Sequence, residues 1–503
     1  PSLPFLVFPL PFPHSSLSSF PSHFPIALSR LFAMGTPLLF LLAFSFSFFS
    51  ALSFSPFSPV DNHLINCGSA LDAAVDGRRF VSDFHSSNPG TPLQSSALTT
   101  ALCNGSPRSS SPQIYHTARV FRKPSRYAVE IKEPGTHMVR LHFDPFVSSN
   151  SDLREARFHV LVDNYVALSN FTVSDTLVKE YLVWVSQNKL VITIVPTQKG
   201  KLGFVNAIEV LSAPKDLIPD TATLVRDGET QKFEGLIKQG LETVHRVNVG
   251  GPKVTPFNDS VWRTWIPDDG FFKSSDLSSK VHFSGRINYQ VGGASREVCP
   301  DFVYNSARVI ASKSSSIPEA NMNWVFRVTG GHRYLVRLHF CDIASLSLGS
   351  LYFNVYINEQ LASKDVDLSS IAYELASPYY ADFVVDSDNL GAVSVVIGRS
   401  NLSMAYAVDG ILNGVEIMKM NNSMASFDGK MCRGMALKNW PRGNSGGLIT
   451  LVVVLCLLLL SVSMLMRRKI VRVKDSFSWT KLPTEVSEVN LKVGIQSSLG
   501  DGS

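Results

Sequence analysis

The segment Arg140-Leu-His-Phe143 occurs again, residue for residue, as Arg337-Leu-His-Phe340. Each copy lies in a short run of β-branched and aromatic residues, and clusters of Gly, Pro, Asn, Asp and Ser separate such runs along the chain. This composition and spacing predict an all-β fold, a sandwich or barrel rather than a series of βαβ units. The clearest of the expected strands are Met138–Phe143, Arg157–Val162, Glu180–Val185 and Lys189–Val195.

Three further motifs repeat in the same order. Thr117-Ala-Arg-Val120 matches Ser306-Ala-Arg-Val309, Phe158-His-Val160 matches Phe353-Asn-Val355, and Asn206-Ala-Ile-Glu-Val210 matches Asn413-Gly-Val-Glu-Ile417. Four matches in one order and at similar offsets indicate an internal duplication. We therefore predict two tandem β-sandwich domains, residues 60–212 and 245–420. Residues 213–244 would form an ordered interdomain linker, in which Phe233–Val244 is the best helical candidate.

One long apolar segment lies near the C-terminal end, GLITLVVVLCLLLLSVSMLM, Gly447–Met466. A run of about 20 uncharged residues is long enough to cross a bilayer as a helix, and a buried core helix is the alternative. Arg467, Arg468 and Lys469 follow directly, so the side after the helix should be cytoplasmic. Residues 421–446 would then form a juxtamembrane stalk outside the cell, and residues 467–503 a short disordered cytoplasmic tail.

The N-terminal residues contain a predicted secretion signal, which is preceded by a segment that we interpret as upstream sequence. Residues 1–33 show neither the periodicity of a helix nor that of a strand, and they precede the first methionine. We therefore interpret them as non-native or upstream sequence. Residues 34–53 have the apolar core of a signal peptide, whose removal gives a type I topology with the N-terminal part outside. Five sequons agree, because all lie between the signal and the membrane segment. The expected glycosylation sites are Asn104, Asn170, Asn258, Asn401 and Asn421.

Charge and cysteine usage exclude several classes of protein. The net charge is +5 with no basic block outside the juxtamembrane stretch, so we expect no nucleic-acid partner. The cysteines show no CxxC spacing, and we expect neither a metal nor a cofactor. Cys456 lies in the membrane segment. For the other five cysteines, two disulfides and one free thiol suit an extracellular location. The pairs Cys67–Cys103 and Cys299–Cys341 would each stay within one domain, with Cys432 as the odd cysteine.

Several motifs in combination resemble one protein family. They are Leu64-Ile-Asn-Cys-Gly68, Glu242–Gly251, Trp262-Arg-Thr-Trp265 with Pro267-Asp268-Asp269, Tyr304–Arg308 and Arg333–Asp342. Over residues 60–420 they resemble the tandem malectin-like ectodomain of plant receptor-like kinases of the Catharanthus roseus receptor-like kinase 1-like family. The resemblance implies a plasma-membrane receptor that binds cell-wall polysaccharide (pectin) or secreted rapid-alkalinisation-factor peptides. The partners that it implies are a glycosylphosphatidylinositol-anchored co-receptor and a kinase-bearing receptor of the same family.

Members of that family normally signal through a cytoplasmic Ser/Thr kinase. The residues after the membrane segment hold no glycine-rich phosphate loop and no VAIK, HRD or DFG motif. We therefore expect a receptor or co-receptor without enzymatic activity, and the alternative is a receptor kinase whose gene model is truncated. A wall glycoside hydrolase is disfavoured, because the adjacent Asp268 and Asp269 would point to opposite faces of a strand instead of converging.

The resemblance also directs attention to aromatic residues. Malectin holds disaccharides with aromatic stacking and polar contacts from loops at one end of the sandwich, which is the general physics of sugar binding. We take Tyr115, Phe146 and Tyr304 as ligand-binding candidates, with core packing as the alternative for the two tyrosines. Trp262 and Trp265 are expected to be core or interdomain residues.

The repeated strand motif carries two further candidate pairs. His142 and His339 have no metal-ligand partners at suitable spacing, so they are expected to be core or strand histidines. Arg140 and Arg337 are expected to form salt bridges on the face of a strand, and contact with an acidic polysaccharide is the alternative.

Overall fold

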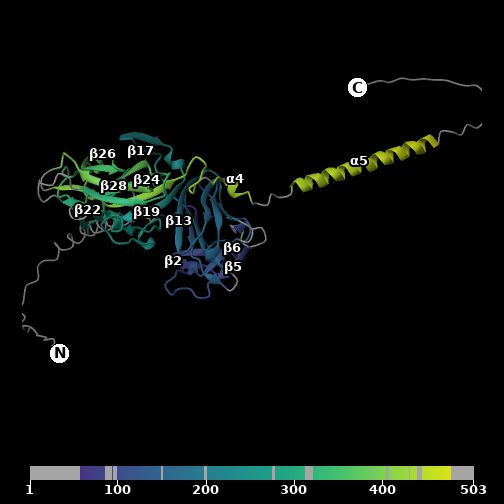
Figure 1. The fold of residues 1–503 in the computed structure, drawn as a ribbon, viewed down its shortest axis with the longest axis horizontal. Helices are drawn as coiled ribbons and strands as arrows, with labels where there is room; N and C mark the ends of the chain where they lie inside the picture. Colours follow the sequence, from purple (N-terminus) through teal and green to yellow (C-terminus); the bar gives the residue numbers. More distant parts are fainter. Residues whose placement is uncertain are drawn as a thin grey trace, which may run out of the picture. The chain divides into compact units, whose positions relative to one another are not determined.

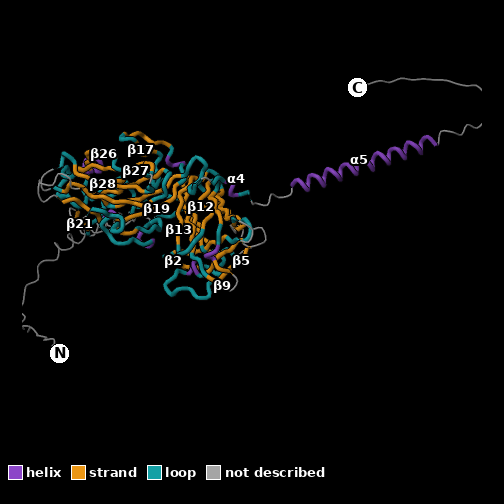
Figure 2. The backbone as a smooth tube through the Cα atoms, viewed as in Figure 1, coloured by secondary structure: helices purple, strands orange, loops and turns teal. Residues whose placement is uncertain are grey.

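The computed structural model describes residues 57–84, 93–94, 99–148, 151–197, 201–274, 278–311, 321–388, 390–403, 407–429, 431–438 and 445–476. β-Strands dominate these residues, as the sequence predicts (Figures 1 and 2). The expected upstream segment, the signal peptide and residues 477–503 lie outside the described residues. The chain divides into two compact units, residues 1–433 and 434–503.

The first sandwich has one sheet of long strands, a facing sheet and a small three-stranded sheet. Its elements are β1 (Asn62–Asn66), β2 (Ala73–Val75), β3 (Arg78–Ser82), β4 (Leu93–Gln94), β5 (Thr99–Cys103), η1 (Gln113–Tyr115), β6 (Thr117–Phe121), β7 (Ser125–Glu130), β8 (Gly135–Phe143), β9 (Val147–Ser148), β10 (Ser151–Asp152), η2 (Leu153–Glu155), β11 (Phe158–Val162), β12 (Tyr165–Phe171), β13 (Leu177–Val185), β14 (Lys189–Pro196), β15 (Gly203–Val205) and β16 (Ala207–Ser212). The four strands expected from the sequence most clearly are β8, β11, β13 and β14. All four predictions are confirmed.

The second sandwich repeats this plan. Its elements are β19 (Leu241–Asn248), η4 (Pro256–Asn258), β20 (Ile266–Pro267), β21 (Ser278–His282), α2 (Asp301–Tyr304), β22 (Ser306–Ala311), β23 (Asn321–Arg327), β24 (Arg333–Cys341), β25 (Tyr352–Ile357), β26 (Gln360–Asp367), α3 (Leu368–Ala372), β27 (Pro378–Asp386), β28 (Ala392–Arg399), β29 (Val408–Leu412) and β30 (Gly414–Met420). In the first copy β8 pairs with β13 and β16, and in the second β24 pairs with β27 and β30. The repeated RLHF motif therefore occupies the same central strand twice, which confirms the duplication.

The two sandwiches share one sheet. Strand β13 of the first pairs with β19 of the second, with Tyr181 opposite Glu242 and Leu182 opposite Leu241. This pairing makes a continuous 13-stranded sheet. A common apolar cluster also joins side chains of both sandwiches, including Met138 of the first and Leu335 of the second. Backbone hydrogen bonds and a shared core thus fuse the domains.

The segment between the sandwiches is a hairpin. Strands β17 (Thr221–Arg226) and β18 (Glu229–Glu234) are antiparallel, and Asp227 and Gly228 at the turn both have positive φ (54° and 80°). Asp-Gly with positive φ at both positions is the favoured two-residue hairpin turn. The helix expected over Phe233–Val244 is wrong: this range holds the end of β18, the short 3₁₀ helix η3 (Leu236–Lys238) and the start of β19. Pairing with neighbouring strands overrides the weak local helical pattern.

Residues after the second sandwich return to the first. Ser426 forms a parallel bridge with Val166 of β12, and Phe427 is fully buried, 5.7 Å from the ring of Tyr165 and 5.2 Å from that of Tyr181. We call residues 422–428 the C-terminal strap. This part of the range expected to be a juxtamembrane stalk is therefore packed into the core of the first sandwich. Among the described residues between the strap and the long helix α5 (Ser445–Ser476), one short helix occurs, α4 (Arg433–Ala436).

Near the start of each sandwich, a glycine lies directly against the backbone of another strand. Gly68 and Gly250 have φ of +74° and +72°, and a Cβ at either position would lie 2.2 Å from a carbonyl oxygen, of Ala118 and Ala307 respectively. A separation below 3.0 Å requires the backbone to move. The glycines of the repeated opening motifs are thus required by close approach as well as by φ.

Replacing Gly250 by alanine should therefore lower the free energy of unfolding by about 1–3 kcal/mol. The matched control is Gly228→Ala in the hairpin turn, where φ is also positive (+80°) but no atom lies within 4 Å of the added Cβ. Urea unfolding of both variants separates the clash from the φ strain. Equal losses would contradict the packing argument.

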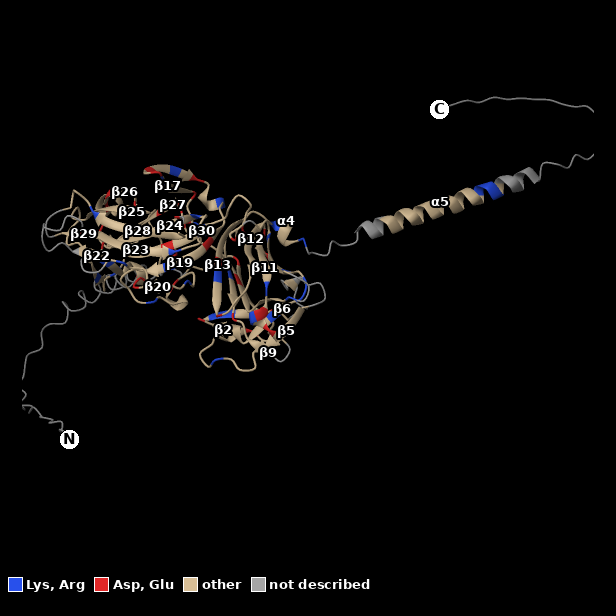
Figure 3. Cartoon of the chain, viewed as in Figure 1, with Lys and Arg blue, Asp and Glu red and all other residues tan. Residues whose placement is uncertain are grey.

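The second compact unit contains the single apolar helix α5 (Ser445–Ser476). Among the described residues, it alone is long and apolar enough to cross a membrane, over Thr450–Ile470. Leu455 and Leu459 are exposed, and a helix apolar all round with no protein covering suits lipid. Figure 3 shows a basic band toward one end of α5, where Arg467, Arg468 and Lys469 follow the apolar stretch. The helix fits the expected single transmembrane span.

Candidate functional site

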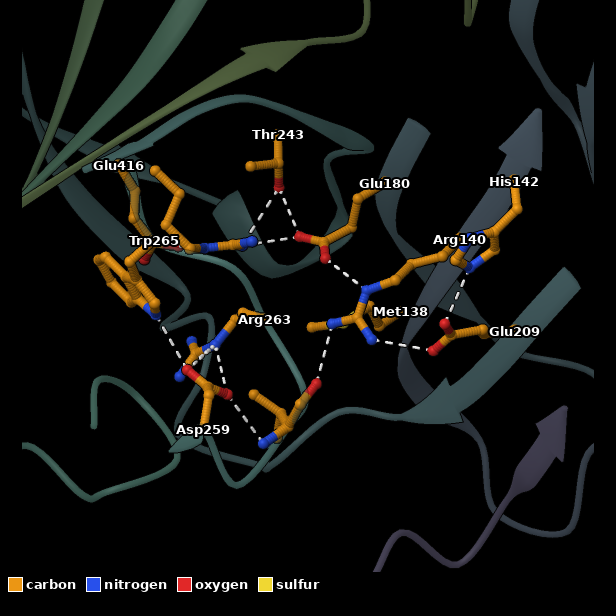
Figure 4. Close-up of polar contacts among 12 residues, drawn as sticks. Met138, Arg140, His142, Glu180, Glu209, Thr243, Asp259, Arg263, Trp265 and Glu416 are labelled. Carbon is orange, nitrogen blue, oxygen red and sulfur yellow. Dashed lines mark hydrogen bonds and ion pairs between the residues drawn. The ribbon is translucent and has the colours of Figure 1, made fainter. Parts of the chain in front are cut away.

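A buried network of charges fills the junction between the sandwiches (Figure 4). Arg140 on β8 contacts Glu180 on β13 at 2.7 Å and Glu209 on β16 at 3.0 Å. Arg246 on β19 contacts Glu180 at 2.7 Å and Glu416 on β30 at 2.6 Å. Arg246 thus links a carboxylate of each sandwich. The strand-face salt bridges expected for the repeated arginines are confirmed, in the second copy by Arg337–Asp382 at 2.7 Å.

The arginines keep these carboxylates ionised. Burial alone would raise the pKa of Glu180, but the guanidinium groups of Arg246 and Arg140 outweigh it and lower that pKa to about 2. Burial likewise opposes ionisation of Glu209 and Glu416, yet their pKa values are also lowered, mainly by Arg140 and Arg246 respectively. The junction therefore holds its charges in place over the physiological range of pH.

Acid should lower the stability of the two fused sandwiches in two stages. Burial lowers the pKa of His339, so below about pH 6.5 the unfolded histidine binds a proton that the folded one excludes. Unfolded glutamates take up protons near pH 4.3, whereas Glu180 does so only near 2. Stability should decline gently below pH 6.5 and more steeply below about 4.5. Melting temperatures from pH 8 to pH 3 check this, and a rise in stability from pH 6.5 to 4.5 would contradict it.

A cavity of about 540 Å³ opens beside this network. Trp262 lines it with φ of +58°, a strained conformation for a large side chain. The guanidinium of Arg78 lies 5.1 Å from the centre of the Trp262 ring, and its buried Nε has no hydrogen-bond partner. Lys253 is exposed on the cavity wall. An aromatic face and cationic donors are the groups that bind a sugar carrying carboxylates.

The three ligand-binding candidates take different places. Tyr115 lines the junction cavity, 7% exposed, with its hydroxyl 3.0 Å from Nδ1 of His142. Phe146 lies in the core of the first sandwich, and Tyr304 is fully buried in a separate cluster of the second. Of the three candidates, Tyr115 is the one that lines the junction cavity. Sequence reasoning singled out Trp262 only as a core or interdomain residue and missed Arg78, because its stacking partner is 184 residues away in sequence.

The repeated histidines and the Asp-Asp pair have structural roles. His142 and His339 are buried and contact Glu209 and Glu416 at 2.9 and 3.4 Å, as core histidines would. No cluster able to hold a metal ion occurs among the residues that the structure describes. Asp268 is buried against Arg308 at 2.5 Å and accepts from the Gly250 amide, so it fastens the opening glycine in place.

The structure does not show the expected disulfides, and the pairs Cys67–Cys103 and Cys299–Cys341 stay predictions. The structure records all six cysteines as free. Cys67 is buried whereas Cys103 is exposed, and Cys299 and Cys341 both lie in an apolar cluster of the second sandwich. Burial raises the pKa of the Cys67, Cys299 and Cys341 thiols, so all three are protonated and unreactive at neutral pH.

The expected glycosylation sites remain predictions, and the structure adds their exposure. Asn170, Asn258 and Asn401 are exposed. Asn104 and Asn421 are half-buried, and Nδ2 of Asn421 donates to the carbonyl of Asn422 at 3.0 Å.

In the described residues, two fused β-sandwiches are followed by one helix apolar enough to span a membrane, which indicates a single-pass membrane protein with a β-sandwich ectodomain. Residues 65–420 match the Malectin-like domain family. A probable receptor-like protein kinase of Arabidopsis thaliana is 42% identical over 433 residues, covering 85% of this chain and 52% of that protein. Receptor-like protein kinase HERK 1 of the same plant is 38% identical, covering 86% and 52%. The chain belongs to the malectin-like receptor family, in the Catharanthus roseus receptor-like kinase 1-like group.

A solved complex shows the same ectodomain fold. It is the complex of the plant peptide RALF23 with FER and LLG2, in which the matched chain has a TM-score of 0.65 and 29% identity to this chain. The match covers 74% of this chain and 99% of that one. The chain spans about half the length of the curated relatives it matches.

Proposed function

We propose that this protein is a plasma-membrane receptor whose ectodomain perceives a secreted peptide of the RALF class outside the cell, together with a glycosylphosphatidylinositol-anchored co-receptor. The observation that carries the proposal is the likeness of the whole ectodomain to a chain in the RALF23 complex with FER and LLG2. Plant cell-wall and growth signalling is the process in which such a receptor would act.

Binding of RALF23 to the full chain in lipid nanodiscs, with and without LLG2, tests the proposal. We expect saturable binding that LLG2 strengthens by at least about tenfold, because two weak contacts on one peptide add their free energies. A scrambled peptide of the same composition is the control. No binding in the presence of LLG2 would overturn the proposal.

A second candidate ligand is acidic wall polysaccharide at the junction cavity. The strained Trp262, the stacked Arg78 and the exposed Lys253 favour it. Replacing Trp262 by alanine should weaken binding of pectic oligogalacturonide by about 10-fold or more, as expected for a lost stacking platform. The control is Phe257→Ala, which removes an aromatic ring that is 77% exposed and does not line the cavity. Equal effects of the two substitutions would exclude the cavity as the sugar site.

The cytoplasmic effector would be a Ser/Thr kinase, since the relatives are receptor-like kinases. Two sources of that kinase are possible: a continuation of this chain, or a kinase-bearing receptor of the same family that associates with it. Full-length transcripts that read through Ser503 into VAIK, HRD and DFG codons would establish the first source. Transcripts that all stop there would establish the second.

A further inference from the structure

Strand β27 has one fully paired edge and one partly open edge. It pairs with β24 along its whole length, from Pro378 to Asp386. On its other edge β17 pairs only at Phe383 and Val384, and the described strands leave Pro378–Asp382 unpaired there. This stretch extends over about 16 Å, and its alternate residues point their backbone N–H and C=O groups to the open edge, except that Pro378 has no N–H.

A groove runs along this open edge. A cavity of about 840 Å³ is lined by β27 residues of both faces of the strand: Tyr379 and Ala381, which pack toward the core, and Tyr380 and Asp382, which face Arg337. Lining from both faces places the cavity beside the strand edge, not over the sheet. The other walls come from the β17–β18 hairpin, from Ala362 and Ser363 of β26, and from the small residues of the 292–294 loop.

The groove continues past the start of β27. A second cavity of about 590 Å³ shares Gly292, Gly293 and Tyr379 with the first. Ser377 lines it, and although this residue is only 3% exposed, its hydroxyl has no hydrogen-bond partner. A buried polar group without a partner is costly, and a ligand that reaches it would relieve that cost.

Two exposed apolar residues lie at the far end of the second cavity, and the backbone of one of them has a positive φ. Tyr373 ends α3 with φ of +58° and is 80% exposed, and Ile371 beside it is 41% exposed. An exposed aromatic ring on a residue whose backbone has a positive φ is unusual for a surface that contacts only water. This end offers an apolar contact to an occupant of the groove.

The charges of the groove favour a basic occupant. Its acidic lining residues are Asp216, Glu374 and Asp382, and its one cation, Lys232, is paired with Glu234 at 2.8 Å. Asp382 is neutralised by Arg337, whereas Asp216 and Glu374 have no ion-pair partner among the described residues. A lysine or arginine of the occupant would meet these two carboxylates.

We propose that the groove binds an extended basic peptide segment, which adds a strand to the open edge of β27 between Pro378 and Asp382. Backbone hydrogen bonds along the edge would supply affinity, and the Tyr373 end and the two carboxylates would select side chains. This inference rests on the proposed perception of a secreted peptide and gives that peptide a site. The groove is distinct from the junction cavity, with which it shares no lining residue.

Hydrogen exchange on the full chain in nanodiscs, with RALF23 and LLG2 as the probes, tests the site. We expect the amides of residues 379–382 that point away from β24 to exchange at least about 10-fold more slowly in the complex, because new ladder bonds protect them, whereas the alternate amides already face β24. Protection confined to other surfaces would overturn the inference and leave the proposed function standing. Failure of RALF23 to bind the unaltered chain would overturn both.

Two substitutions and a control supply an independent measurement. Thr221 is exposed at the start of β17 and lines the groove, so Thr221→Trp should fill it and weaken RALF23 binding by about 10-fold or more. Ser377→Ala, which leaves the shape of the groove intact, should weaken binding several-fold. Ser279→Trp, at an exposed position of β21 outside the groove, should leave affinity unchanged. Unchanged affinity in all three variants would overturn the inference.

Discussion

Replacing Arg246 by alanine should lower the free energy of unfolding of the two fused sandwiches by about 3–5 kcal/mol. The guanidinium bridges Glu180 and Glu416 at 2.7 and 2.6 Å, and all three side chains are more than nine-tenths buried. Without it the two carboxylates keep weaker partners, Arg140 for Glu180 and His339 for Glu416. Each must then protonate or remain charged in a poorly solvated junction, and either outcome costs stability.

Urea unfolding of residues 57–433 measures the effect. The matched control is Arg79→Ala, which removes an equally short ion pair with Asp72 (2.6 Å) from a side chain that is 80% exposed. A solvent-exposed pair contributes about 0–1 kcal/mol, so the control should change little. Similar small losses in both variants would show that the junction charges are well hydrated and do not fix the two sandwiches together.

Replacing Phe427 by alanine should cost about 3–5 kcal/mol, the usual range for a large aromatic side chain removed from a core. Its ring is fully buried between Tyr165 and Tyr181 of the first sandwich, although the second sandwich ends before it in the sequence. The neighbouring Met424→Ala is the control, because Met424 is 39% exposed. Thermal unfolding and hydrogen exchange of β12 check the result.

A chain ended at Met420 extends the same test. It retains every strand of both sandwiches but lacks the strap, including Phe427 and the contact of Asp428 with the Ser169 amide at 2.8 Å. We expect it to lose as much stability as Phe427→Ala or more, and to expose the site between Tyr165 and Tyr181. Wild-type stability of the shortened chain would mean that the strap does not stabilise the first sandwich. The segment that leads to the membrane helix would then begin at the end of the second sandwich.

The elements that carry repeated motifs could be predicted closely from the sequence. Strands β8 and β24 share five consecutive identical residues, and each lies at the centre of its sandwich between two corresponding strands. Alternation of apolar residues and turn-forming clusters is a local signal, so it survives without knowledge of the fold. The membrane helix was predictable for the same reason.

The candidate site was only partly predictable. Tyr115 was singled out by its place before a repeated motif, and it does line the junction cavity. Phe146 was singled out by its place after the first Arg-Leu-His-Phe strand, where malectin carries aromatic residues, and it lies in the core. Exposure depends on which segments cover a residue, and that information is spread over distant parts of the chain.

The sequence by itself therefore determined the all-β class, the duplication, the pairing of arginine with carboxylate on each central strand, and the single membrane-spanning helix. Only the tertiary structure decided that the sandwiches share one sheet, that the linker is a hairpin, that the strap returns to the first sandwich, and that β27 keeps an open edge. The first set depends on the order and period of neighbouring residues. The second depends on contacts between segments as far apart as Val166 and Ser426, which leave no pattern in either segment alone.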